Sequence, residues 1–139
     1  MQMTNLELYH VARWLYLHKA PWLATGFVLA QRLLLGAHIP ASVRIGKGCK
    51  LAYGGAGVVI HARAVIGDNC VISPGVVIGG RSGHETVPTI GDGVTLYPGC
   101  MVLGPIAVGD GAIVGPNAVL LKDLAPGGVY VAPLGRVIS

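Results

Sequence analysis

Residues 58–79 read VVIHARAVIGDNCVISPGVVIG, and an aliphatic residue returns at every sixth position of this stretch. The same period continues beyond it, at Ile60, Ile66, Ile72, Ile78, Ile90, Leu96, Val102, Val108, Val114 and Leu120. One strand and turn of six residues cannot bury its apolar face alone, so such units must stack on one another. The repeat therefore predicts a mainly β structure, a parallel β-helix.

A second inward position follows each aliphatic residue by four places and holds a small or apolar side chain. Cys49, Cys70 and Cys100 all occupy it, which favours buried thiols over a disulfide or a metal site. An earlier run, Ile39, Ile45 and Leu51, keeps the period but is offset by three. The offset predicts a three-residue insertion within residues 52–59.

This pattern resembles the hexapeptide-repeat acyltransferases, whose coils are left-handed parallel β-helices with three hexads per turn. Such a coil would stack Ile60, Ile78, Leu96 and Val114 in one column. Over about residues 38–136 the chain looks most like the serine acetyltransferases and their sugar-acetylating relatives. The matching stretches are Gly57–Ile60, Ala64–Asp68, Val76–Gly80, Pro88–Asp92, Val102–Ile106 and Ala118–Asp123. The resemblance implies acetyl-CoA as acyl donor and a homotrimer with active sites between subunits.

Three positions depart from the serine acetyltransferase pattern. The family's Asp-His pair falls on Tyr53 and Gly54, the Asp of its Asp-Ile-His-Pro motif is missing around His38, and its loop His falls on Val87. What remains resembles a branch from polysaccharide gene sets, so a sugar hydroxyl is the preferred acceptor. A serine O-acetyltransferase of cysteine biosynthesis is the alternative, and a non-catalytic β-helix scaffold is a second one.

Residues 79–89, GGRSGHETVPT, break the repeat. His84 would fall on the core-facing position there, so we expect a loop, and loops on rigid scaffolds often carry function. Taking the proton from a hydroxyl that attacks a thioester suits an imidazole, which titrates near neutral pH. His84 is therefore the favoured base, with Arg81 or Glu85 orienting the acceptor or the imidazole.

Two further histidines remain candidates. His61 follows the inward Ile60 and should point outward, next to the glycines of the phase break. His38 lies at the junction of helix and coil and, with Tyr53, could contact the acceptor. Backbone N–H groups of a Gly-rich turn could stabilise the oxyanion. The sequence leaves open which histidine is the base.

The resemblance also places the acetyl-CoA contacts. They fall near Gly79, Gly80, Pro98, Gly99 and Pro116. The prolines lack an N–H, so carbonyl contacts must serve there. Lys122 and Arg136 are candidates for the CoA phosphates.

Residues 1–38 have a different pattern and predict a helical cap, before a β-helix acyltransferase domain over residues 39–139. Thr4 and Glu7 form a capping box for a helix running to about His18. A second helix should start at Pro21 and stop at Gly36. We expect the two helices to cap the lower end of the coil or to pack between subunits.

Composition limits the remaining choices. The chain has 139 residues, 53% hydrophobic and 12% charged, which excludes a disordered chain. Its net charge of +4 comes from scattered Lys and Arg, which argues against nucleic-acid binding. No metal-binding motif occurs. Residues 22–35 are apolar but too short to span a bilayer, so we expect a cytoplasmic protein. Contact of these helices with a membrane surface is an alternative to packing, which is favoured.

Overall fold

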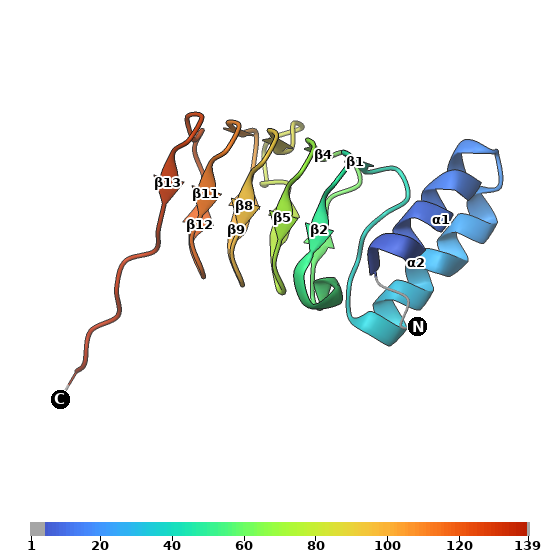
Figure 1. Ribbon diagram of the computed structural model, residues 1–139, viewed down its shortest axis with the longest axis horizontal. Coiled ribbons are helices and arrows are strands. Elements are labelled where there is room, and N and C mark those ends of the chain that lie inside the picture. Colours follow the sequence, from blue (N-terminus) through green and yellow to red (C-terminus); the bar gives the residue numbers. More distant parts are fainter. Residues whose placement is uncertain (1–4, 139) are drawn as a thin grey trace.

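The computed structural model describes residues 5–138 and shows two helices at one end of a stack of short parallel strands (Figure 1). The helices are α1 (Asn5–Leu17) and α2 (Pro21–Leu35). The strands are β1 (Arg44–Ile45), β2 (Lys50–Leu51), β3 (Val59–Ile60), β4 (Val65–Ile66), β5 (Val71–Ile72), β6 (Val77–Gly79), β7 (Thr89–Ile90), β8 (Thr95–Leu96), β9 (Met101–Leu103), β10 (Ala107–Val108), β11 (Ile113–Val114), β12 (Val119–Leu120) and β13 (Val129–Tyr130). The two helices confirm the predicted N-terminal helical segment, although Thr4 of the predicted capping box lies outside the described residues.

The strands form three parallel sheets that make the sides of a prism. Sheet A has the order β12-β9-β6-β3, sheet B the order β1-β4-β7-β10, and sheet C the order β13-β11-β8-β5-β2. Each turn of the chain visits the three sheets in succession, which confirms the β-helix. Arg44 pairs with Val65, 21 positions on, whereas Val59 pairs with Val77, 18 positions on. The three-residue insertion between these two segments is therefore confirmed.

The predicted stacking column is wrong beyond Ile78. Ile78 pairs with Val102, 24 positions on, and Leu96 stacks instead between Ile72 and Val114. The reason is the segment between β6 and β7, which holds one hexad more than a regular corner. That hexad projects as a loop instead of forming a strand, as expected, so every later hexad lies one sheet earlier in the B-C-A order than the unbroken repeat predicts.

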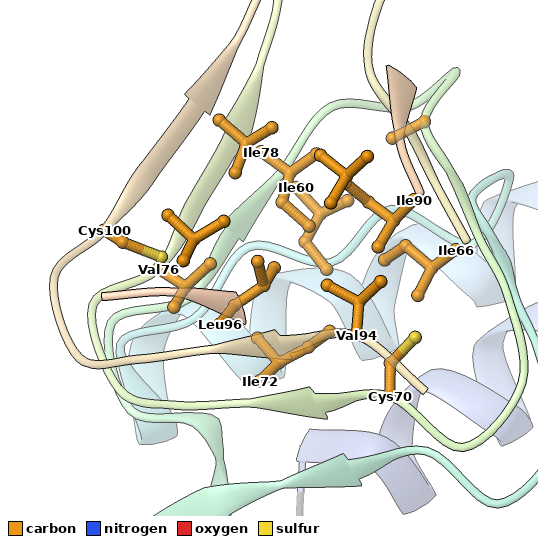
Figure 2. Packing of buried hydrophobic residues seen from close by; sticks show 14 of the residues in the cluster. Ile60, Ile66, Cys70, Ile72, Val76, Ile78, Ile90, Val94, Leu96 and Cys100 are labelled. Atoms are coloured by element: carbon orange, nitrogen blue, oxygen red, sulfur yellow. The ribbon is translucent and has the colours of Figure 1, made fainter. Parts of the chain in front are cut away.

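The core fills the inside of the prism (Figure 2). Side chains such as Ile60, Ile78 and Leu96 point inward and are fully buried. Cys70 and Cys100 lie among them, and burial raises the pKa of each thiol to about 11. The cysteines are buried and free, as predicted.

Helix α1 closes the lower end of the core through specific polar contacts. The Tyr9 hydroxyl donates to the Val43 carbonyl at 2.8 Å, and the Asn5 amide donates to the Gly54 carbonyl at 2.6 Å. The buried Gln31 of α2 donates to the Asn5 carbonyl at 2.7 Å, which ties both helices to the turn of the phase break. Helix α2 is capped by Gly36, whose φ of 64° lies in the left-handed region that favours glycine.

Stacked aspartates hold the corner between sheets B and C. The Asp68 carboxylate accepts the Lys47 N–H, Asp92 accepts the Asp68 N–H, and Asp110 accepts the Asp92 N–H, all at 2.7–2.8 Å. Each carboxylate thus satisfies a backbone donor of the preceding coil. In the sequence, the Gly-Asp dipeptides of the repeat mark this corner.

Candidate functional site

An open pocket of about 330 Å³ lies at the corner where sheet A meets sheet B. It is lined by His38, Pro40, Val59, Ile60, His61, Ala62, Ile78 and Gly79. His38 reaches it because its backbone pairs with β3: its N–H donates to the Val58 carbonyl at 2.8 Å, and its carbonyl accepts the Ile60 N–H at 2.9 Å. Two histidines that the sequence presented as separate candidates thus share one pocket.

The His61 ring is held by its own turn. Its Nδ1 accepts the Arg63 N–H at 3.2 Å. A neutral imidazole that accepts at Nδ1 carries its proton on Nε2 and is therefore a donor there. The ring of His38 makes no hydrogen bond to any of residues 5–138. The two imidazoles therefore differ in which groups they offer.

Gly80 lies beside the His61 ring at the base of the loop. A Cβ at Gly80 would stand 3.8 Å from His61 Cδ2 and 3.9 Å from its Nε2. The Gly80 N–H has no hydrogen-bond partner among the described residues. This corner thus offers an unused backbone donor close to an imidazole, the type of group expected for an oxyanion.

The other loop residues lie further out. Arg81 packs on the next coil, where a Cβ at Gly104 would stand 3.3 Å from Arg81 Cβ. The His84 N–H donates to the Arg81 carbonyl at 3.1 Å, which closes a turn. His84 and Glu85 are exposed, and neither side chain makes a hydrogen bond within the described part of the chain. Among residues 5–138 of one copy, no hydrogen bond joins His84, the favoured base, to the pocket, and His84 is not among its lining residues.

A second group of candidates occupies the corner between sheets C and A. Tyr53 is 91% exposed and has a φ of 51°, an uncommon value for a residue other than glycine. Pro98 and Pro116 follow one another in successive coils. The Pro98 carbonyl already accepts the Asn117 N–H at 3.0 Å, whereas the Pro116 carbonyl accepts no hydrogen bond from the described residues. Of the two prolines, Pro116 therefore has the free carbonyl that a contact with acetyl-CoA would need.

The two groups lie at opposite edges of sheet A. One group lies just after strands of sheet A, and it comprises His61, the loop between β6 and β7, and Lys122. The other group lies just before strands of sheet A, and it comprises Tyr53, Gly99 and Pro116. Lys122 is exposed, and Arg136 lies in the exposed C-terminal segment that leaves the coil (Figure 1). One copy of the chain therefore does not bring the predicted residues into a single site.

Sequence reasoning missed two features of this region. The 21-position offset before the phase break pairs His38 with Val59 and hence places it beside His61. Asn5 and Gln31 were not singled out, although both are fully buried and fix the turn of Gly54 and Gly55. A polar residue on an apolar helix was the available signal.

Comparison with known proteins identifies the family. Residues 88–122 match the profile described as bacterial transferase hexapeptide (six repeats). Over 136 residues the chain is 34% identical to the serine acetyltransferase of Helicobacter pylori (strain ATCC 700392 / 26695), covering 96% of this chain and 79% of that protein. The serine acetyltransferase of Synechococcus elongatus is 35% identical over 96% of this chain and 55% of its own length. The chain therefore belongs to the serine acetyltransferase family of hexapeptide-repeat transferases.

A solved structure agrees with this assignment. Soybean serine acetyltransferase complexed with serine superposes with a TM-score of 0.85 at 33% identity, covering 96% of this chain and 56% of that one. The chain thus spans about half the length of several of its relatives. These proteins favour the serine alternative over the sugar acceptor, and they give no support to the polysaccharide branch.

Proposed function

We propose that the chain is an acetyl-CoA-dependent O-acetyltransferase whose proton transfer takes place in the pocket of His38 and His61. The observation that carries the proposal is the placement of two imidazoles and the free Gly80 N–H at one corner of the coil. Family membership supports the reaction class. The chemistry of the pocket supports the roles that we propose for its residues.

The reaction needs a base, a donor for the oxyanion and a path for one proton. His38, with both ring nitrogens free of hydrogen bonds to the described residues, takes the hydroxyl proton as the acceptor oxygen bonds to the thioester carbon. The His61 Nε2–H and the Gly80 N–H stabilise the negative carbonyl oxygen. The C–S bond then breaks, and the proton passes from His38 to the departing CoA thiolate.

The acceptor is a small hydroxyl compound, and serine is the first candidate because the relatives are serine acetyltransferases. The sugar hydroxyl is the second candidate, because Tyr53 and Gly54 stand where the resemblance places the Asp-His pair of the serine enzymes. An exposed aromatic ring is a common surface for a sugar, whereas it offers no charge to a serine ammonium group.

We also propose that the site is completed by a second copy in a homotrimer. The outer face of sheet A carries a ladder of apolar side chains in register, Val59, Val77, Met101 and Val119. Packing this face against a neighbour would bring the corner of His61 to the corner of Tyr53 and Pro116. The acetyl-CoA contacts predicted at Pro98, Gly99 and Pro116 would then join the same site.

The test is the release of CoA thiol from acetyl-CoA with serine and with free and nucleotide-linked sugars. His38→Ala should lower kcat/KM by about 10²–10⁴. His61→Ala should lower it by about 10²–10³, and His61→Asn, which keeps an N–H donor, should recover part of that loss. His10→Ala, on the exposed face of α1, is the matched control.

Unchanged activity in His38→Ala would remove it as the base. A large loss in His84→Ala alone would return that role to the loop. No binding of CoA by calorimetry would favour the scaffold alternative over any transferase.

A further inference from the structure

Helix α2 presents a broad apolar face to solvent. Trp22 and Leu33 are each 74% exposed and Leu34 is 77% exposed. At 3.6 residues per turn, these side chains share one side of the helix with further uncharged residues, Leu23, Gly26, Phe27, Leu29 and Ala30. A broad apolar helix face is ordinarily packed against a partner, so this side of α2 requires one.

The centre of this side is hollowed. A groove of about 310 Å³ is lined by Trp22, Leu23, Gly26, Phe27 and Ala30, whose side chains hold one polar group, the indole N–H. A Cβ at Gly26 would meet nothing within 4 Å, so glycine leaves the groove open there. The carbon lining of the groove fits a hydrocarbon chain.

The charges beside the groove are basic. Helix α2 contains no carboxylate, and its one charged residue, Arg32, is exposed. Lys19 is exposed just before the helix, and the exposed Trp14 ring stacks on His18 with centroids 4.3 Å apart. An apolar face with tryptophan and basic residues beside it is the pattern of a helix lying in the plane of an anionic membrane.

We propose that the apolar face of α2 binds the surface of a membrane that contains anionic lipids. No helix in the described part of the chain is long and apolar enough to cross a bilayer, so α2 would lie flat with Trp22 and Leu33 among the acyl chains. A second copy fits less well. In an antiparallel twofold pairing, Arg32 of one copy would approach Lys19 of the other, with no carboxylate on α2 to compensate. Helix α2 lies at the end of the stack opposite β13 (Figure 1).

The proposal is tested by sedimentation of the full chain with vesicles, without acetyl-CoA, so that the result is independent of the proposed transferase activity. The chain should sediment with mixed phosphatidylglycerol–phosphatidylcholine vesicles and far less with pure phosphatidylcholine. Leu33→Gln combined with Leu34→Gln should weaken binding at least ten-fold. Arg32→Gln should weaken it about five-fold and reduce its dependence on salt.

Leu134→Gln combined with Val137→Gln is the matched control, because these residues are 98% and 95% exposed but lie in the C-terminal segment. It should leave binding unchanged, and thermal unfolding should be the same for all variants. No binding of the unaltered chain to the mixed vesicles, or an equal loss in the control pair, would overturn the proposal. So would a change of sedimentation coefficient in the Leu33/Leu34 variant with vesicle binding intact, which would make this face a contact between copies.

Discussion

Each stacked carboxylate at the corner of sheets B and C accepts one backbone N–H from the preceding coil, so its contribution to stability can be tested by a single substitution. Asp92→Ala removes the acceptor of the Asp68 N–H, which stands 2.7 Å away. We predict a loss of about 1–2 kcal/mol in the free energy of unfolding, the usual cost of a lost charge-assisted hydrogen bond. Urea unfolding measures it. Glu85→Ala is the control and should change stability by less than about 0.5 kcal/mol.

The buried thiols predict an alkaline limit to stability. The ordinary thiol pKa is 9.0, and burial raises that of Cys70 and Cys100 to about 11. As the pH rises from 9 to 11, the unfolded chain loses these protons first, so the free energy of unfolding should fall, by up to ~2 kcal/mol per thiol. Cys70→Val, which copies Val94 in the next coil, should remove part of this fall. An identical pH profile in that variant would contradict the assignment.

For single residues, the sequence predicts whether a side chain points into the core better than it predicts which side chains come together. Inward and outward positions follow from the six-residue period, so the burial of Ile60 and Cys70 was predictable. The meeting of His38 and His61 also follows from the length of the phase break, because the predicted insertion places His38 against Val59. The donor character of His61 depends on a single hydrogen bond from Arg63, which no sequence pattern indicates.

Among the elements, the loop between β6 and β7 is separable from the coil. Removing residues 80–85 would return the distance from Ile78 to Ile90 to one regular hexad. We predict that this deletion keeps the coil and shifts the midpoint of thermal unfolding by only a few degrees, because its residues are exposed. Activity should fall at least ten-fold, through loss of Gly80 and Arg81. A variant that unfolds cooperatively but keeps full activity would exclude the loop from the site.

The helices were predictable in extent but not in attachment. Pro21 and Gly36 mark the ends of α2, and the structure places the helix between them. The tie from Gln31 through Asn5 to Gly54 joins segments some 50 positions apart, and local patterns carry no information on such contacts. The predicted stacking column was wrong for a related reason. The extra hexad of the loop lengthens the spacing between stacked residues from 18 to 24 positions.

For the whole molecule, the separation of the two corners makes a prediction about assembly. His61→Ala and Pro116→Trp should each inactivate the protein alone. The first removes a catalytic group from one corner of sheet A, and the second blocks the other corner. Refolding an equal mixture should restore about a quarter of the activity, since random trimers then pair intact corners from neighbouring copies. Sedimentation confirms that the mixture assembles. No recovery in assembled mixtures would place the whole site in one copy.

The extra hexad between β6 and β7 has a consequence for how such a protein diversifies. Strands β7 and β9, after the loop, pair in regular register with β4 and β6. The packing of the core therefore does not depend on the length of the loop. On the proposed function, where this loop adjoins the pocket, exchange of this one exposed segment should alter substrate choice with no compensating change elsewhere. A library of grafted segments at Gly79–Thr89 would sample new acceptors on a frame that already folds.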